Sequence, residues 1–493
     1  MPAKRARFTL FVPIALFVAW TFFSKASDLT APSPKDSLCF ACLKIRVGLP
    51  IVEQGPVPDK IDNVFTEIEL PGGRFRGFTA NSVTYAIDGA NPMNMRGPLR
   101  PVLGRAPKGK YGESGKWINH AERVGNVVWA WVHDETGDAA NQGLKSMSIA
   151  MSKDDGLSWK DLGQIINGTD SLTHGRITGE GDCTAVNGGD SYYYAYCWRN
   201  TSGAEIVARA PVADPRPGKW QKFYSGKWDQ PGVRGESTGL PKGMGGTAAR
   251  WTKNGEILLL GWMHGGMGLQ FSKDEKTFTD FIQFPEPLMD LDSCTWNRPA
   301  PCEIVFYQDL LDAKTGGNQL SDAWFMTYMY LQPNEGFDKR YLVFRKVEVS
   351  IADAPVTPQV GILLARWYDA KLKDRWATTA AVPAPRGSTY KLEKQLGYLM
   401  TIAEPGKQTV KLEDCASNWP GHPDHMLDQK YECDAGRYQR LRTAGWVYSK
   451  PQEHTVPLYR CYNAGDRSHF VSSESSCENL GKMEHLLGYA LSQ

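Results

Sequence analysis

Ser152-Lys153-Asp154-Asp155-Gly156-Leu157-Ser158-Trp159 is the stretch of this chain that decides its fold. The preceding run, Ser146–Met151, alternates small or polar residues with apolar ones, which is typical of a half-buried β-strand. Asp154 can bond its own backbone two residues on, and Gly156 can take a positive φ, so a turn here closes without strain. Trp159 can then fold back over the hairpin as an apolar plug. The stretch therefore predicts a tight turn between two strands.

This octapeptide fits the pattern S-x-D-x-G-x-x-W and resembles the Asp-box of sialidases and other secreted β-propellers. In those families the turn lies on the outer edge of a blade, away from the active centre, so the resemblance implies an architecture and no chemistry. Phe271–Phe278 looks like a second, decayed copy that lacks the glycine. Sialidases also need an early arginine in an F/Y-R-I-P-like segment, which this chain lacks; Arg250 and Arg298 are isolated candidates only.

Composition favours a mostly β protein of two or three domains. The chain has 493 residues, with 49 Gly, 16 Trp and 20 Tyr, and few long runs of helical periodicity. Its 56 basic and 54 acidic residues nearly balance, and no basic patch stands out. Nucleic acid is therefore not an expected partner.

The N-terminus reads as an export signal. Basic residues in Lys4–Arg7 precede an apolar run, Phe8–Phe23, and Ser24–Ala26 offers small residues at the positions that a signal peptidase reads. The apolar run is short for a membrane span, which needs about 20 residues. We expect a cleaved signal over 1–26 and a linker over 27–59, with a secreted, periplasmic or cell-surface protein as the result. An uncleaved anchor is the alternative, and only then would a membrane be a partner.

The ten cysteines support an oxidising compartment. Neighbouring cysteines are close enough in sequence to close a hairpin or small loop, so local pairing is the simplest hypothesis. A redox role for the CxxC at the first pair is the alternative. The pairs are Cys39/Cys42, Cys183/Cys197, Cys294/Cys302, Cys415/Cys433 and Cys461/Cys477.

The last third of the chain repeats, with copies that begin near 361, 410 and 456. Leu364–Ala370 aligns without gaps on Leu458–Ala464. The second and third copies each carry a pair of cysteines, and the first copy has neither. If each pair forms a disulfide within its own copy, the two cysteines must be present or absent together, as they are here. Three copies of about 45 residues suit a β-trefoil-like domain over 361–493. Some positions carry different residues in the three copies, such as Trp376, Met426 and Phe470. The sequence does not show whether these residues bind a ligand or belong to the core.

The third copy resembles a repeat family found in secreted bacterial proteins beside hydrolase domains. This resemblance implies an accessory domain that binds carbohydrate or a surface. The arginine, tyrosine and Gly-Tyr positions that the copies share have a second interpretation, in which they hold the hairpins of the domain together.

Residues 60–352 are predicted to form a β-propeller of five blades. Strand-like runs recur in pairs, in units that begin near 118, 180, 245 and 298, after a first unit over 62–105. A sixth blade is the alternative if the 280–340 stretch hides a short one. The chain is thus expected to be all-β: a propeller followed by the three-repeat domain. Such five-bladed propellers resemble secreted glycosidases of the arabinanase and xylosidase type.

That resemblance implies carboxylates at the start of the innermost strands, pointing into the axial funnel, where one acts as acid and another as base or nucleophile. Glu180 and Asp182 are the best placed, because Gly-Glu-Gly-Asp puts both on one side of an extended chain. Glu236 and Asp88 come next. For each, a solvated turn residue is the alternative. Other carboxylates lie near blade two and include Glu122, Asp134 and Glu135.

Several other side chains are candidates for lining the funnel. The alternative is a capped loop for the histidines and arginines, and blade core for the tryptophans. The two histidines also keep open a lyase, which needs a Tyr or His base. These substrate-binding candidates are His174, Arg176, Trp262, His264, Trp296 and Arg298.

The sequence therefore predicts an exported glycoside hydrolase that acts on a polysaccharide or glycan with paired funnel carboxylates. The alternative is a non-enzymatic lectin or adhesin, since fold does not fix function. The nine histidines do not cluster as ligands, and no metal site or cofactor is predicted. A structural Ca²⁺ on the propeller axis stays open, because its carboxylate and carbonyl ligands would form no local motif.

Overall fold

The computed structural model describes residues 38–57, 60–137, 143–243, 245–263, 266–283, 297–357, 359–381, 389–417, 419, 421–429, 433 and 436–492. The chain divides into two units, Met1–Leu38 and Cys39–Gln493, and the second contains every strand found among the described residues. The predicted signal over 1–26 lies outside the described residues. Among those described, no helix is long and apolar enough to cross a membrane.

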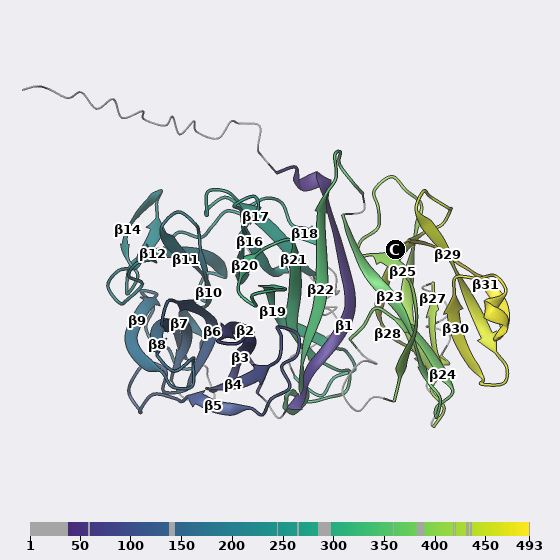
Figure 1. Cartoon of the computed structure of the whole chain (residues 1–493), viewed down its shortest axis with the longest axis horizontal. Coiled ribbons are helices and arrows are strands. Elements are labelled where there is room, and N and C mark those ends of the chain that lie inside the picture. Colours follow the sequence, from purple (N-terminus) through teal and green to yellow (C-terminus); the bar gives the residue numbers. More distant parts are fainter. Residues whose placement is uncertain are drawn as a thin grey trace, which may run out of the picture. The chain divides into compact units, whose positions relative to one another are not determined.

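The second unit is all-β, as predicted (Figure 1). Its described residues form strands and three short 3₁₀ helices, with no α-helix among them. The helices are η1 (Phe40–Cys42), η2 (Phe337–Lys339) and η3 (Cys477–Asn479).

Five antiparallel sheets of four or five strands make up the propeller. Neighbouring innermost strands contact one another from the first blade to the last, which is the radial arrangement of blades. The prediction of five blades is confirmed. The first three blades are β2 (Thr66–Leu70), β3 (Arg74–Asn81), β4 (Val83–Gly89) and β5 (Arg100–Leu103); β6 (Gly115–Val124), β7 (Val127–Thr136), β8 (Leu144–Ser152) and β9 (Lys160–Asn167); and β10 (Thr178–Asn187), β11 (Tyr192–Arg199), β12 (Ala204–Pro211), β13 (Gln221–Tyr224) and β14 (Lys227–Pro231).

Each of the last two blades contains one strand that is distant in sequence from the others. Blade 4 consists of β15 (Gly246–Trp251), β16 (Ile257–Met263), β17 (Gly266–Ser272) and β18 (Ile282–Gln283), with β20 (Gln319–Leu320) added in parallel beside β15. Blade 5 consists of β19 (Ile304–Asp312), β21 (Ala323–Leu331), β22 (Arg340–Ile351) and the N-terminal strand β1 (Leu43–Val57).

The linker predicted over 27–59 is therefore wrong for its second half. Leu43, Ile45 and Val47 are fully buried, and β1 pairs antiparallel with β22 from Leu43↔Ile351 onward. The alternation of these apolar residues with Lys44 and Arg46 is itself a strand signal. The N-terminal strand thus closes the propeller by completing its last blade.

The apolar core of the propeller lies between neighbouring blades. One buried cluster joins Phe65 of the first blade to Phe325 and Phe344 of the last, and so closes the ring. Others join blades 1 and 2, blades 2 and 3, and blades 3 and 4. Trp131 of β7 and Tyr193 of β11 meet edge to face, with ring centroids 4.9 Å apart.

The turn at Ser152–Trp159 joins β8 to β9, with Gly156 at φ +81° as expected. The Asp154 carboxylate accepts hydrogen bonds from the backbone N–H of Ser158 (2.9 Å) and from its hydroxyl (2.6 Å). The expected bond from Asp154 to the backbone two residues on is not formed, because the Gly156 N–H donates to Ser152 Oγ instead. The Trp159 ring packs edge to face on Phe78 of blade 1. The turn thus fastens two blades together.

The segment Phe271–Phe278 forms a turn of the same kind between β17 and β18. Asp274 accepts hydrogen bonds from the backbone N–H groups of Lys276 and Thr277 and from the Thr277 hydroxyl, and Phe278 packs on Tyr196. The assignment of both turns to the Asp-box family stays a prediction.

Replacement of Asp154 by alanine is expected to lower the free energy of unfolding by about 1–2 kcal/mol, because the turn loses three side-chain hydrogen bonds. Thermal unfolding measures the change. The matched control is Lys153→Ala, at an exposed position of the same turn, which should leave the unfolding temperature unchanged. Equal stability of the two variants would contradict the role given to Asp154.

Local pairing of cysteines is confirmed at four sites. The disulfides are Cys39–Cys42, Cys183–Cys197, Cys415–Cys433 and Cys461–Cys477. Cys302 is also disulfide-bonded, and its predicted partner, Cys294, lies outside the described residues.

The C-terminal third forms three sheets of three strands, one for each predicted copy. The third strands pair with one another at Met400↔Trp446, Tyr398↔Leu491 and Tyr448↔Tyr489, around one shared apolar core. The threefold repeat is confirmed, and its classification as a trefoil stays a prediction. The copies are β23 (Val360–Asp369), β24 (Asp374–Thr378) and β25 (Lys391–Met400); β26 (Thr409–Ser417), β27 (His425–Asp428) and β28 (Tyr438–Tyr448); and β29 (Thr455–Asn463), β30 (Ser468–Ser472) and β31 (Lys482–Leu491).

The residues that differ between the copies make the contacts between copies. The indole N–H of Trp376 in the first copy donates to Asp414 in the second. At the equivalent positions, Met426 Sδ of the second copy accepts a contact from Arg460 of the third, and the Phe470 ring of the third lies under the Arg366 guanidinium of the first. At this position, each copy therefore uses a different side chain to contact the copy next to it.

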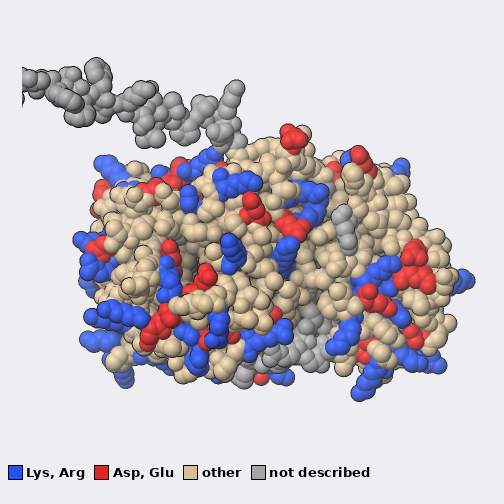
Figure 2. Space-filling view, in the orientation of Figure 1, with Lys and Arg blue, Asp and Glu red and all other residues tan. Residues whose placement is uncertain are grey.

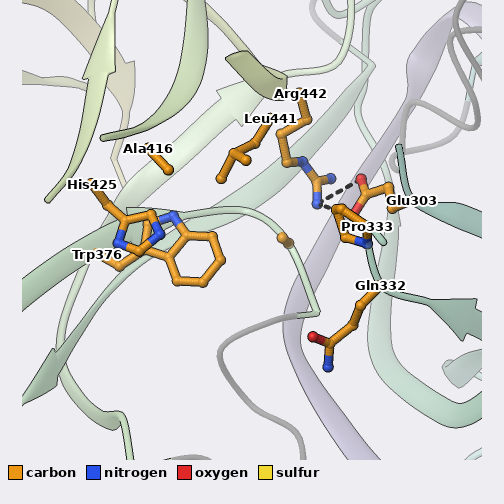
Figure 3. Close-up of a pocket in the computed structure, with 9 residues that line it drawn as sticks. Glu303, Gln332, Pro333, Trp376, Ala416, His425, Leu441 and Arg442 are labelled. Atoms are coloured by element: carbon orange, nitrogen blue, oxygen red, sulfur yellow. Dashed lines mark hydrogen bonds and ion pairs between the residues drawn. The ribbon is translucent and has the colours of Figure 1, made fainter. Parts of the chain in front are cut away.

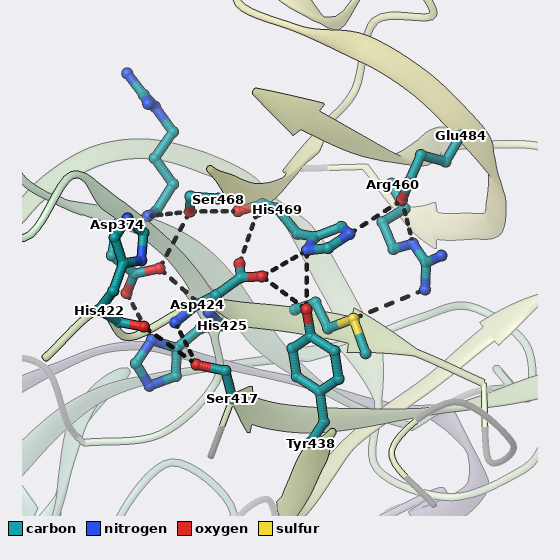
Figure 4. A network of polar contacts seen from close by, with 12 residues as sticks. Asp374, Ser417, His422, Asp424, His425, Tyr438, Arg460, Ser468, His469 and Glu484 are labelled. Carbon is teal, nitrogen blue, oxygen red and sulfur yellow. Dashed lines mark hydrogen bonds and ion pairs between the residues drawn. The ribbon is translucent and has the colours of Figure 1, made fainter. Parts of the chain in front are cut away.

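A chain of polar contacts follows the same threefold pattern (Figure 4). His425 Nδ1 lies 2.6 Å from Asp374 of the preceding copy, and His469 Nδ1 lies 2.8 Å from Asp424. In the third contact, the backbone N–H of Arg375 donates to Ser468 Oγ. Burial alone would lower the pKa of His469, but Asp424 and Glu484 raise it to about 9.

The stability of the protein is expected to fall as the pH rises from about 6.5 to 9. A histidine whose pKa is higher in the folded state stabilises fully below its unfolded pKa, and this contribution is lost as pH rises through the folded value. For His469 the loss reaches about 3 kcal/mol, at about 1.4 kcal/mol for each pKa unit. Thermal unfolding across this range measures it. Asp424→Asn should flatten the dependence; an unchanged slope would contradict this origin.

Candidate functional site

Two innermost strands of the propeller carry a bulge where a residue takes left-handed backbone geometry. Asp182 of β10 has φ +52° and Tyr307 of β19 has φ +54°, each within an interruption of the strand register. Such geometry is uncommon for residues other than glycine, and bulges redirect side chains next to active sites. The two bulges therefore mark the part of the funnel where an active site is expected.

The Asp182 carboxylate lies among three side chains of blade 2. Lys145 Nζ of β8 is 2.6 Å from Oδ2, and His133 Nε2 of β7 is 3.4 Å from Oδ1. Glu135 Oε1 lies 3.4 Å from the same His133 nitrogen and 3.7 Å from Lys145 Nζ. The side chain of Asp182 is 40% exposed, so a ligand can reach it.

The backbone of Asp182 sets the tautomer of His133. Its N–H donates to His133 Nδ1 over 2.9 Å, so Nδ1 acts as an acceptor and the ring N–H lies on Nε2. That N–H is directed at the carboxylates of Glu135 and Asp182. The imidazole therefore holds the Asp182 carboxylate from one side while Lys145 holds it from the other.

These contacts keep Asp182 ionised. Burial alone would raise its pKa, but His133 and Lys145 lower it to about 2. Burial would lower the pKa of Lys145, yet Asp182, Glu135 and Asp62 together raise it. At neutral pH the funnel thus presents a negatively charged carboxylate that is fixed in place.

A second carboxylate, Asp62, lies just before β2 in blade 1. It accepts a hydrogen bond from the Tyr307 hydroxyl (3.0 Å) and pairs with Arg340 at 2.6 Å. Burial raises the pKa of Tyr307 well above 10, with Asp62 and Asp182 adding to the rise. Because Asp62 acts on Lys145 and Asp182 acts on Tyr307, the two carboxylates belong to one electrostatic site.

A third carboxyl, Glu205 at the start of β12, is held neutral. It is 1% exposed, and neither of its oxygens has a hydrogen-bond partner in the part of the chain that the structure describes. Burial, with Asp182 as the second cause, raises its pKa well above the ordinary value. Gly243 lies directly over it, since a Cβ there would be 2.9 Å from Glu205 Cβ.

Of the four carboxylates predicted to be catalytic, Asp182 alone is placed in this cluster by the contacts found, together with Glu135 from strand β7 of blade 2. Glu180 is 1% exposed and turns to Lys222 Nζ of β13 (2.5 Å) and the Ser237 hydroxyl (2.6 Å). Its carboxylate is thus engaged in an ion pair inside blade 3. The catalytic role of Glu180 stays a prediction.

Glu236 and Asp88 lie elsewhere. Glu236 is an exposed residue of the loop between β14 and β15. Asp88, at the end of β4, forms a bidentate ion pair with Arg76 and a further bond to Arg100. Arg76 also donates to the backbone of Asp155, which places Asp88 beside the Ser152–Trp159 turn.

The predicted substrate-binding residues are not gathered at the funnel by any contact found among the described residues. His174 and Arg176 are exposed on the loop before β10. Arg298 donates to the backbone carbonyls of Glu335, Cys302 and Gln332, and so secures a loop. Trp262 lies in β16, and the structure does not describe its side chain; His264 and Trp296 lie outside the described residues.

Sequence reasoning missed five residues of the site: Asp62, His133, Lys145, Glu205 and Tyr307. Lys145 of β8 lies opposite Glu135 of β7, two residues after His133. This pairing follows from strand register, which one sequence does not show. Asp62 did have a signal, because it directly precedes the first strand of the first predicted unit.

No three or more His, Cys, Asp or Glu side chains gather in a metal-binding arrangement within the described ranges. A structural Ca²⁺ on the propeller axis stays a prediction. Figure 2 shows basic and acidic side chains interspersed over the visible face, with no extended patch of one sign on it.

No family model and no curated protein matches the chain. Among solved structures, Zg3597, a family 117 glycoside hydrolase of the marine bacterium Zobellia galactanivorans, is 10% identical, with 63% of this chain and 92% of that chain covered and a TM-score of 0.41. The catalytic domain of a GH62 alpha-L-arabinofuranosidase from Coprinopsis cinerea is 10% identical, covering 63% and 99%, with a TM-score of 0.40. An exo-1,5-alpha-L-arabinanase from a bovine ruminal metagenomic library is 11% identical, covering 60% and 95%, with a TM-score of 0.36. Values this low establish neither a shared family nor a shared activity.

Proposed function

We propose that this chain is a glycoside hydrolase that works at the funnel of its propeller. The observation that carries the proposal is the Asp182 carboxylate, which Lys145 and His133 fix in place at a bulge of an innermost strand. Glycoside hydrolysis uses a pair of carboxyl groups with different protonation states, and the pKa values of Asp182 and Glu205 are shifted in opposite directions.

In this proposal Asp182 is the ionised carboxylate. Lys145 and His133 hold it negative and fix its direction, as a nucleophile or a base for water requires. Asp62, oriented by Tyr307 and Arg340, positions the sugar and stabilises the positive charge that develops at the anomeric carbon. The separation of the carboxyl groups that act on the substrate decides between retention and inversion.

The proton for the leaving oxygen comes from Glu205 in this proposal. A general acid must be protonated at the working pH, and the raised pKa of Glu205 keeps it so. Gly243 packs against this side chain, since a Cβ there would lie 2.9 Å from Glu205 Cβ, and the transfer requires that the substrate gain access to the buried carboxyl.

Glu205→Gln is expected to lower kcat about 10²- to 10⁴-fold and to leave the stability nearly unchanged. Glutamine replaces a carboxyl that is already neutral, so burial costs it little more, but an amide cannot donate the proton. The kcat against pH and the unfolding temperature are measured on the same preparation. Full activity of this variant would show that Glu205 is a buried structural residue and not the general acid. It would not change the role proposed for Asp182.

The test of the proposal is release of sugar from a panel of polysaccharides, followed by reducing-end detection. Arabinan, xylan, galactan, mannan and agar cover furanosides and pyranosides. Hydrolysis of one of them that is lost in Asp182→Asn supports the proposal. Binding of a polysaccharide without product, unchanged in that variant, would make the chain a lectin, the alternative left by its sequence.

The lyase alternative is disfavoured by the same site. Tyr307 is the tyrosine of the funnel, and its pKa lies well above 10. It is therefore a poor base at neutral pH. Of the two histidines that kept this alternative open, His174 is exposed on a loop and His264 lies outside the described residues.

A further inference from the structure

A cavity lies between blade 5 and the first two copies of the C-terminal repeat (Figure 3). It holds about 190 Å³, several times the roughly 30 Å³ that a water molecule takes in the liquid. Its wall is mostly apolar, with a tryptophan on one side and a few polar groups on the other. The residues that matter here are Trp376, Ala416, His425, Arg442, Glu303 and Gln332.

The cavity exists because the second copy has an alanine, Ala416, where each of the other two copies has a tyrosine. The equivalent residues, Tyr368 and Tyr462, fill this space in the other copies. The Tyr368 ring lies 4.1 Å from the Arg375 guanidinium, and the Tyr462 ring lies 4.9 Å from that of His469. In the second copy, Ala416 is paired with His425 across the strands, and no ring fills that space.

The tryptophan that lines the cavity is held rigidly. The Trp376 ring stacks on His425 with centroids 4.0 Å apart and an angle of 13°. Its indole N–H donates to the Asp414 carboxylate at 2.9 Å and 3.1 Å. A pre-oriented aromatic face costs little ordering entropy when a ligand stacks on it.

The titratable side chains that line the cavity each have a partner, and that of His425 is the Asp374 carboxylate, at 2.6 Å. Arg442 pairs with Glu303 at 2.9 Å, and the Tyr330 hydroxyl donates to the same carboxylate. The Gln332 amide lies at the same side of the cavity in Figure 3. An apolar wall with a few placed hydrogen-bonding groups and with its charges already paired suits a neutral, hydroxylated ring.

The cavity and the active site are linked through one strand of blade 5. Glu303 directly precedes β19, and Tyr307, four residues further on, bonds to Asp62 of the active site. At roughly 3.3 Å per residue, the two positions are about 13 Å apart along the strand.

We propose that this cavity binds one sugar unit of a neutral glycan outside the catalytic funnel, by stacking on Trp376. The inference rests on the proposed function for the class of its ligand. It assigns to the second repeat a role that the other two copies, with tyrosine at the position of Ala416, do not share.

Isothermal titration of the full chain in the Asp182→Asn background tests the site without hydrolysis. The probes are arabinohexaose, xylohexaose, cellohexaose, mannohexaose and agarohexaose, with the disaccharide of each. Ala416→Tyr should raise the Kd for the bound hexasaccharide at least tenfold and leave that for the disaccharide in the funnel unchanged. Ala416→Ser keeps the cavity open and is the matched control. Gln332→Ala, which leaves the repeat untouched, should raise the same Kd about threefold.

Equal Kd values for Ala416→Tyr and Ala416→Ser, or no binding by any hexasaccharide, would overturn the site. If Ala416→Tyr fails to fold, an unchanged Kd in Gln332→Ala has the same meaning. Failure of the proposed function is separate, because it appears as absence of product with the wild-type chain. If the wild-type chain hydrolyses no polysaccharide but the cavity still binds sugar, the cavity is a lectin site and the inference stands.

Discussion

Asp182→Asn is expected to lower kcat on the hydrolysed polysaccharide by about 10³-fold while the protein stays folded. Asparagine keeps the size of the side chain but loses the charge that Lys145 and His133 hold in place. It can neither attack the sugar nor take a proton from water. Activity is measured by sugar release, and folding by circular dichroism and thermal unfolding.

Asp229→Asn, at an exposed position of β14, the outermost strand of the same blade, is the matched control and should retain wild-type activity. The pH dependence gives a second readout. With a pKa of about 2, Asp182 stays ionised across the usual assay range, so it contributes no acidic limb above pH 3. Lys145→Met removes one of the two groups that lower this pKa, and an acidic limb should then move up toward pH 4. An Asp182→Asn variant with full activity would refute the role of this carboxylate.

Lys222→Met is expected to destabilise the protein by about 3 kcal/mol, because it removes the nearer of the two cations beside the buried carboxylate of Glu180 and leaves only Arg199, at 3.9 Å. Lys222 is 0% exposed and also donates to the backbone carbonyls of Asn167 and Gly235. Chemical denaturation measures the loss. Pairing this change with Glu180→Gln should recover part of the stability, since the second change removes the stranded charge.

The same double variant decides what Glu180 does. If Glu180 serves the interior of blade 3, the folded double variant hydrolyses substrate at close to the wild-type rate. If it is stable and inactive, Glu180 is a catalytic carboxylate, as its position in the sequence suggests. Wild-type stability for Lys222→Met alone would contradict the ion pair as a structural element.

Much of the fold was predictable because its signals are local. The alternation of apolar residues, the turn chemistry at Gly156 and the spacing of the cysteines each depend on a few neighbouring residues. The strand β1 is the exception. Its alternation is visible in Leu43–Val47, but its partner, β22, lies about 300 residues further along the chain. Because one sequence does not show such a distant pairing, the prediction of a linker was wrong there.

The site was predictable only in part. Asp182 was identified together with Glu180 because Gly-Glu-Gly-Asp puts both on one side of an extended chain, yet Glu180 has a buried ion pair. The bulge between Gly181 and Thr184 separates their environments. One extra residue in a strand moves the residues that follow it to the opposite face of the sheet. No local sequence pattern marked that bulge.

The sequence by itself determined the all-β composition, the radial repetition of strands and the threefold repeat of the C-terminal domain, because periodicity and turn chemistry are properties of adjacent residues. The tertiary structure alone decided which charged groups meet. His133, Lys145, Asp182 and Tyr307 come from three blades, and their protonation depends on burial and on charges a few ångströms away. Those distances exist only once the ring of blades has closed.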